Sequence, residues 1–227
     1  MHRRHLRALC LLASALAWAS SPPVAMSGTM ENNLNTVREE NREFSGAKAG
    51  RHSAAELAYF DHYGLNFEGA AHTFGRVTVG RWRIAMHRFQ PEDIRGAVLI
   101  VHGYYDHTAT WRHVIQNLLE NGYAVIIYDQ PGHGLSSGEP AAIDSFDHYR
   151  EVLTHFDAWT HAQYPMPVHL LAHSMGAGAV IDYLCTEKGE RSGKVILLAP
   201  LIRSVAWGIS GTAFESVGSH FDSVPRK

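Results

Sequence analysis

The 227-residue chain has few of the features that cross-link or charge a protein. Its two cysteines are Cys10 and Cys185, and Cys10 lies in an N-terminal segment that we expect to be removed, so no intramolecular disulfide is predicted. Basic residues are not in excess, with 20 Lys and Arg against 22 Asp and Glu, and nothing indicates binding to nucleic acid. Stability must therefore come from a hydrophobic core, for which 45% hydrophobic residues suffice.

The chain also has no recognisable metal-binding pattern. Sixteen histidines are a high number, but none falls in a spacing such as H-E-x-x-H. Scattered loop and surface histidines explain the number without a ligand, and we expect no metal and no cofactor.

The apolar run 8–19 is shorter than the ~20 residues that span a bilayer. Three arginines precede it, no acidic residue lies in the first 30 positions, and Ala17-Trp-Ala19 has the pattern of a cleavage site. These features predict a secretory signal peptide over residues 1–19, and therefore export to the periplasm or the medium. An uncleaved membrane anchor and a mitochondrial presequence are the alternatives.

The polar residues 20–52 are predicted to be a linker or loosely held arm. The pattern Ser53-Ala-Ala-Glu56 is a capping box, which opens a short helix through Tyr63. We expect the folded core to start there and to cover residues 53–203.

The spacing of apolar residues predicts an α/β fold. Alternation in segments 72–79 and 81–89 indicates an antiparallel pair at a sheet edge. Later apolar runs do not alternate, which is typical of parallel strands covered on both faces. These runs are 97–101, 124–128, 168–172 and 195–199. Helical periodicity fills the gaps, so we predict a doubly wound, mostly parallel sheet with an antiparallel N-terminal edge.

Small and polar residues follow three of the predicted parallel strands. The three motifs are His102-Gly103-Tyr104, Asp129-x-x-Gly132-His133-Gly134-x-Ser136 and His173-Ser174-Met175-Gly176. Because the carboxyl ends of parallel strands share one edge and ligands bind there, the motifs predict one site. Ser174 lies at a strand-to-helix turn, which suits a nucleophile, and an ordinary helix cap is the alternative.

In this order, the three motifs resemble the α/β-hydrolase superfamily over about residues 57–202. They are most similar to its monoacylglycerol lipase and lysophospholipase-like branch, grouped with the S33 serine aminopeptidases. The resemblance implies a serine hydrolase that cleaves a small-molecule or lipid ester through an acyl-enzyme, and it allows peripheral contact with a membrane. A peptidase or thioesterase of the same fold is an alternative, and no oligomeric state is predicted.

The resemblance also implies a role for each motif residue. Ser174 would be the nucleophile, and the backbone N–H groups of Tyr104 and Met175 would form the oxyanion hole. The remaining motif residues would shape or support the loops: His102, Gly103, Asp129, Gly132, His133, Gly134 and Gly176.

The acid and histidine of such a triad are expected after Ser174. Beyond residue 203 the chain offers only Glu215, His220 and Asp222, whose order and spacing do not suit a triad. Residues 204–227 instead resemble the start of the cap over the acyl site. We therefore expect a C-terminally truncated hydrolase with little activity alone. The alternative outside the enzymes is a binding or scaffold protein that keeps part of a hydrolase fold.

Overall fold

The computed structural model describes residues 28–40, 42–44, 51–186 and 193–202. The predicted signal peptide and cap, with Glu215, His220 and Asp222, lie outside the described residues. The chain divides into two units, residues 1–32 and 33–227, and of the first only the start of helix α2 (Gly28–Glu40) is described. In the described ranges, no helix has both the length and the apolar character needed to cross a membrane.

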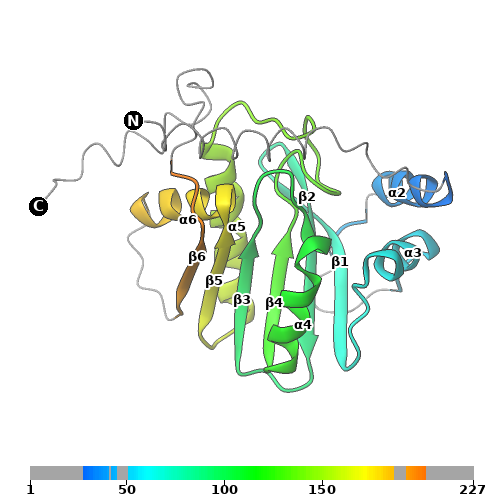
Figure 1. Ribbon diagram of the computed structural model, residues 1–227, viewed down its shortest axis with the longest axis horizontal. Coiled ribbons are helices and arrows are strands. Elements are labelled where there is room, and N and C mark those ends of the chain that lie inside the picture. The colour runs from blue at the N-terminus through cyan, green and yellow to red at the C-terminus, as the bar shows by residue number, and fades with distance from the viewer. Residues whose placement is uncertain (1–27, 41, 45–50, 187–192, 203–227) are drawn as a thin grey trace, which may run out of the picture. The chain divides into compact units, whose positions relative to one another are not determined.

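Six strands of the described chain form one sheet, in the order β1-β2-β4-β3-β5-β6 (Figure 1). The antiparallel edge consists of β1 (Ala70–Val79) and β2 (Trp82–Pro91), and β2 joins β4 antiparallel. The other neighbours are parallel: β3 (Gly96–Val101), β4 (Tyr123–Tyr128), β5 (Val168–His173) and β6 (Val195–Leu198). The predicted α/β class with an antiparallel N-terminal edge is confirmed.

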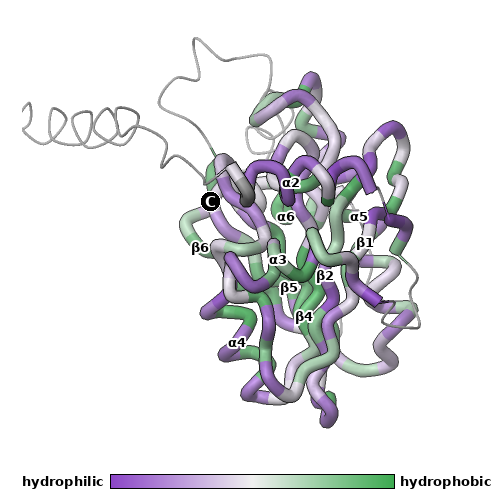
Figure 2. Tube along the Cα trace, turned by 90° about the vertical axis from the view of Figure 1, so that its right-hand side faces the viewer, coloured by the Kyte–Doolittle hydropathy of each residue, from purple (hydrophilic) through white to green (hydrophobic). Residues whose placement is uncertain are grey.

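Helices cover both faces of this sheet (Figure 1). α4 (Arg112–Glu120), which a 3₁₀ turn (Thr108–Trp111) precedes, lies on one face, and α5 (Asp147–Gln163) and α6 (Ser174–Thr186) lie on the other. Successive side chains of β3 belong to two different hydrophobic clusters. Leu99 packs with α5 and α6, whereas its neighbours Val98 and Ile100 pack with α3 and α4. The strands are therefore buried on both sides, and Figure 2 shows β4 and β5 as hydrophobic segments between more hydrophilic outer ones.

The helix α3 (Ala54–Tyr63) begins at the expected capping box. The Ser53 hydroxyl accepts from the Glu56 N–H at 3.1 Å, and the Glu56 carboxylate accepts from the Ser53 N–H at 2.9 Å. Gly64 ends the helix in the left-handed region, with φ 65°.

The helix α2 lies within residues 20–52, where the sequence predicted a linker or arm. Val37 is buried in the cluster beside α3 and α4, and Leu34 packs against the same cluster. Further on, the Phe44 N–H donates to the Arg76 carbonyl at 2.9 Å. Two apolar residues three positions apart give this helix a narrow buried stripe, which a composition average over a polar segment does not show.

Candidate active site

The three motifs meet at one edge of the sheet because of the strand register. Val101, the last residue of β3, pairs with Tyr128 of β4 on one side and with Ala172 of β5 on the other. The segments starting at His102, Asp129 and His173 therefore leave the sheet side by side, at the upper edge in Figure 1.

Ser174 occupies a sharp bend between β5 and α6. Its φ is 51°, in the left-handed region that residues with a Cβ seldom adopt, and its side chain is partly exposed. Within the described residues, its Oγ has no hydrogen bond to a first-turn amide of α6, which a helix cap would need. The geometry is therefore that of a strained turn that presents a hydroxyl group.

Two glycines let the neighbouring loops approach this bend. A Cβ on Gly176 would strike the carbonyl oxygens of Val101 and His102, so only glycine fits where α6 passes the end of β3. A Cβ on Gly103 would lie 3.2 Å from the Ser174 Cβ. The segment that carries Tyr104 therefore passes directly beside Ser174.

The backbone N–H groups of Tyr104 and Met175 form no hydrogen bond to any described residue. Met175 lies in the first turn of α6, where the N–H groups have no partner within the helix and the helix dipole favours negative charge. Two unpaired donors beside a serine hydroxyl can stabilise an oxyanion.

His102 fixes the orientation of the Tyr104 amide. The His102 ring is buried, and its Nε2 accepts from the Gln130 N–H at 2.8 Å, which places the proton of the neutral ring on Nδ1. Nδ1 then donates to the Gly103 carbonyl oxygen at 2.8 Å. Burial lowers the pKa of His102 to about 4, so the ring stays neutral near pH 7.

Asp129 organises the loop after β4. Its Oδ1 accepts from the N–H and the hydroxyl of Thr108, at 2.8 and 2.7 Å, and its Oδ2 accepts from the Leu135 N–H at 2.8 Å. Burial opposes the charge of Asp129, but the facing His102, with other histidines, holds its pKa below the usual range. Asp129 thus ties the loop to the segment that follows Tyr104.

The other residues of this loop make local contacts. Gly132 and Gly134 have φ of 74° and 51°, and His133 Nδ1 lies 2.9 Å from the Pro131 carbonyl oxygen. Ser136 donates to the Asp129 carbonyl at 2.6 Å and accepts from the Ala85 N–H at 2.9 Å. These contacts hold the loop in place.

The Tyr104 side chain has contacts that the sequence motif did not indicate. Its hydroxyl donates to the Ala141 carbonyl at 2.8 Å, and its ring lies edge-on to His133, with 5.7 Å between centroids. The sequence motifs did not indicate the supporting roles of Thr108 and Gln130 either. Their partners lie 21 and 28 positions away, and no local sequence signal marks such contacts.

A general base for Ser174 is not found among the described residues. No histidine follows Ser174 within them, and no histidine ring there is hydrogen-bonded to its Oγ. The acidic residue of α6, Asp182, is engaged by Arg150 at 2.7 Å. The described residues therefore hold the candidate nucleophile and the candidate oxyanion donors, without a general base for Ser174 among them.

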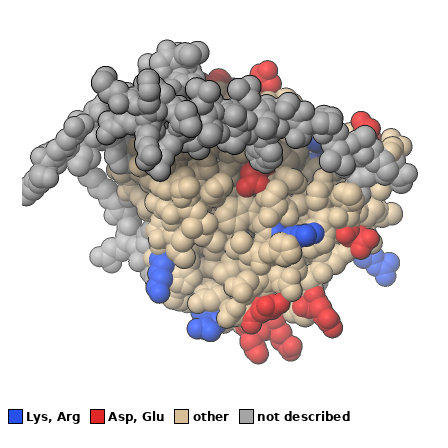
Figure 3. All heavy atoms as spheres, viewed as in Figure 1, with Lys and Arg blue, Asp and Glu red and all other residues tan. Residues whose placement is uncertain are grey.

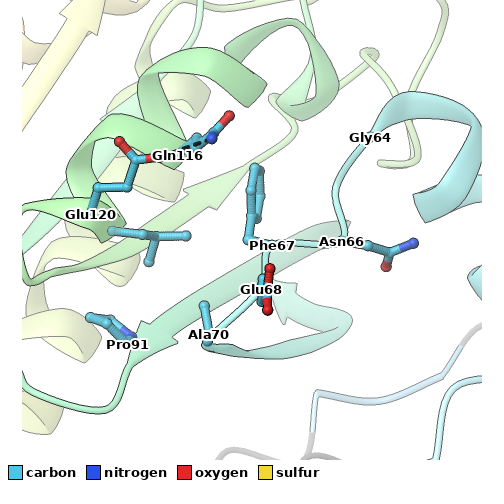
Figure 4. Close-up of a pocket in the computed structure, with 10 residues that line it drawn as sticks. Gly64, Asn66, Phe67, Glu68, Ala70, Pro91, Gln116 and Glu120 are labelled. Atoms are coloured by element: carbon cyan, nitrogen blue, oxygen red, sulfur yellow. Dashed lines mark hydrogen bonds between the residues drawn. The ribbon is translucent and has the colours of Figure 1, made fainter.

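A cavity of about 590 Å³ lies at the opposite edge of the sheet from Ser174 (Figure 4). Its lining includes Phe67, Pro91 at the end of β2, and Leu119 and Glu120 of α4. Figure 3 shows acidic side chains gathered at this lower edge. Because Pro91 leaves the sheet where β4 begins, the cavity is not part of the site around Ser174.

Comparison with known proteins decides the family. A family model described as serine aminopeptidase, S33, matches residues 92–216, which is more than half of the chain and includes all three motifs. The chain belongs to the S33 family. Its fold is accordingly that of the α/β-hydrolases, in agreement with the resemblance seen in the motifs.

Relatives of this S33-family chain include lipases. It is 35% identical over 114 residues to a monoglyceride lipase homolog of Monkeypox virus, covering 49% of this chain and 41% of the relative. It is 32% identical over 127 residues to the monoacylglycerol lipase of Mycolicibacterium smegmatis, covering 55% and 45%. The chain thus spans less than half the length of these relatives.

A solved structure shares the fold. It is a soluble variant of monoglyceride lipase from Saccharomyces cerevisiae in complex with a substrate analog. The TM-score is 0.53 at 25% sequence identity, covering 60% of this chain and 48% of the lipase.

Proposed function

We propose that this chain carries the nucleophile and the oxyanion hole of a serine ester hydrolase. One observation supports this most directly: Ser174 is held at φ 51° at the start of α6, and the backbone N–H groups of the next residue, Met175, and of Tyr104, on the segment that passes beside Ser174, have no partner in the described residues. Backbone strain at a non-glycine residue persists where the surrounding structure enforces it, and it is concentrated at functional sites.

In the proposed reaction, Ser174 Oγ attacks the carbonyl carbon of the ester while a base takes the hydroxyl proton. The electron pair of the C=O bond moves to the oxygen, which accepts hydrogen bonds from the N–H groups of Tyr104 and Met175. Collapse re-forms the C=O bond and expels the alcohol, which receives the proton. Water then cleaves the acyl-enzyme by the same steps and releases the acid.

The substrate class we propose is a lipid ester such as a monoacylglycerol. The lipase names of the relatives support this, and so do two aromatic rings beside the oxyanion amide. Tyr104 is 46% exposed and Tyr105 is 74% exposed, and their ring centroids lie 4.2 Å apart. Exposed tyrosines suit contact with an acyl chain or a lipid surface. The N-terminal pattern of residues 1–19 supports the further proposal that the protein is exported.

Labelling with a fluorophosphonate tests the nucleophile. The purified chain should be labelled at Ser174, with the site located by peptide mass spectrometry, and Ser174→Ala should abolish the label. Ser145→Ala is the matched control, because the Ser145 hydroxyl forms hydrogen bonds with Asp147 at the start of α5. Added imidazole should accelerate the reaction of the wild type and not that of Ser174→Ala, since imidazole can act as a general base for the Ser174 hydroxyl.

Two outcomes would refute the proposed nucleophile. One is a label found only on other residues, and the other is no label on Ser174 at any imidazole concentration, which would favour the scaffold alternative. A comparison of monoacylglycerol with an aminoacyl anilide, each with imidazole, separates an esterase from a peptidase.

A further inference from the structure

A buried arginine connects the N-terminal segment to the loop beside the candidate oxyanion hole. Arg76, on β1, is only 3% exposed, and no carboxylate is within ion-pair distance of its guanidinium in the described chain. Burial lowers its pKa, as expected for a cation taken out of water. Burying such a group is unfavourable unless its donors are satisfied, so its partners show what it holds together.

The partners are two backbone carbonyls from distant parts of the sequence. Nε and Nη2 of Arg76 donate to the Leu135 carbonyl at 3.3 and 3.1 Å, and Nη1 donates to the Val37 carbonyl at 3.1 Å. A planar guanidinium with donors on two sides can bridge two carbonyls in this way, which the single ammonium of lysine cannot reproduce.

The Arg76 backbone extends the same connection. Its N–H donates to the Arg42 carbonyl at 2.7 Å, and its carbonyl accepts from the Phe44 N–H at 2.9 Å. On α2, Arg38 also donates to the Gly134 carbonyl at 3.4 Å. The C-terminal half of α2 and residues 42–44 are thus joined through Arg76 to the loop Gly132–Leu135.

Leu135 links Arg76 to the candidate active site through hydrogen bonds. Its N–H donates to Asp129, and the other carboxylate oxygen of Asp129 holds Thr108, which follows the Tyr104 segment. In the same loop, the His133 ring contacts the rings of both His102 and Tyr104. A shift of the Leu135 carbonyl would therefore move the groups that support the Tyr104 amide.

We propose that Arg76 is a positioning residue for the Tyr104 oxyanion donor, acting through Leu135 and Asp129, with helix α2 as its second anchor. Both Arg76 and α2 precede the segment 92–216 that the family model matches. The functional part of the proposal rests on the proposed role of Ser174.

The experiment compares Arg76→Met and Arg76→Lys with the wild type in the full chain. Arg76→Met keeps the length of the side chain and removes all its donors. We expect the fluorophosphonate to react with Ser174 about tenfold more slowly, because small displacements of catalytic groups cost that much or more. Arg76→Lys should restore only part of the rate, because its shorter side chain ends in a single nitrogen, which does not reproduce the separated donors of the guanidinium.

A stability control separates positioning from general loosening. Tyr183→Phe removes the 2.7 Å hydrogen bond from Tyr183 to Asp157, which joins α6 to α5 away from the loop. Each variant is labelled at a temperature that lies the same number of degrees below its own melting midpoint. Under these conditions the labelling rate of Ser174 in Tyr183→Phe should be within twofold of the wild-type rate.

Hydrogen exchange gives a second readout that does not depend on labelling. The amides of Leu135 and Thr108, both bonded to Asp129, should exchange faster in Arg76→Met and Arg76→Lys than in Tyr183→Phe. If the wild type fails to label but these amides respond, the proposed function fails and the Arg76 connection stands. The proposal is overturned if both Arg76 variants label Ser174 at the wild-type rate, or if the exchange rates of these two amides do not change. If Arg76→Met does not fold, the same two measurements on Arg76→Lys decide.

Discussion

The Nδ1 of His102 donates to the carbonyl oxygen of Gly103 at 2.8 Å, and that carbonyl belongs to the peptide unit whose N–H is that of Tyr104. The described chain has no cis peptide, and in a trans unit the C=O and N–H point in opposite directions. The buried imidazole therefore aims the Tyr104 donor without touching it. This explains why a histidine precedes the glycine at the end of β3.

His102→Ala should weaken both stability and reactivity. The substitution leaves the Gln130 N–H buried without its acceptor, which costs about 1–3 kcal/mol in urea unfolding. It also frees the Gly103 carbonyl, and labelling of Ser174 should slow by roughly 10–100-fold. His113→Ala, an exposed position on α4, is the control and should change neither quantity. A labelling rate equal to wild type in a folded His102→Ala protein would show that the histidine does not orient the amide.

The strain at Ser174 predicts an unusual order of stability for substitutions. At φ 51° glycine is free of strain, whereas alanine carries the same Cβ strain as serine, so Ser174→Gly should be more stable than Ser174→Ala by about 1 kcal/mol in urea unfolding. At the exposed helical position Ala158 the order should reverse, with Ala158→Gly losing about 1 kcal/mol. Equal stability of the two Ser174 variants would contradict an enforced left-handed conformation.

Gly176→Ala should destabilise the protein by about 1–3 kcal/mol, because its methyl group would meet the carbonyl oxygens of Val101 and His102. These oxygens belong to backbone at the end of a buried strand and cannot move aside. Gly28→Ala is the matched control, since nothing lies within 4 Å of a Cβ built there, and its melting temperature should stay unchanged. A Gly176→Ala protein as stable as the wild type would mean that α6 passes β3 at a greater distance.

Buried histidines on β1 and β2 should make the fold sensitive to acid. His72 Nε2 lies 3.0 Å from His87 Nδ1, and burial lowers the pKa of His87 to about 4 and that of His72 well below its usual value. The unfolded chain takes up these protons near pH ~6.5 and the folded chain does not. Stability should therefore fall as the pH drops from ~6.5 toward 4, by about 3 kcal/mol for His87 alone.

The variant His87→Phe tests this pH dependence. The His87 ring packs beside those of Phe74 and Phe89, so a phenyl ring is a reasonable replacement. The urea midpoint of the variant should fall less between pH 7 and pH 4.5 than that of the wild type. His62→Gln, at an exposed position on α3, should keep the wild-type profile. The idea fails if His87→Phe and the wild type lose equal stability over this range.

Strand and motif positions followed from local sequence. The uninterrupted apolar runs predicted the parallel strands, the alternation of 72–79 and 81–89 predicted the β1–β2 pair, and Ser53 and Glu56 marked the start of α3. Each of these signals depends on residues a few positions apart. The helix α2 was missed because its buried stripe consists of two residues in a polar segment.

By itself, the sequence determined the class of sheet, the order of the three motifs and the choice of Ser174 as the residue to examine. Only the tertiary structure decided that His102 holds the Tyr104 peptide, that Asp129 joins Thr108 to Leu135, and that Arg76 joins Leu135 to Val37. The physical reason is distance along the chain. Periodicity and turn preference act over a few residues, whereas these hydrogen bonds join groups that folding alone brings together.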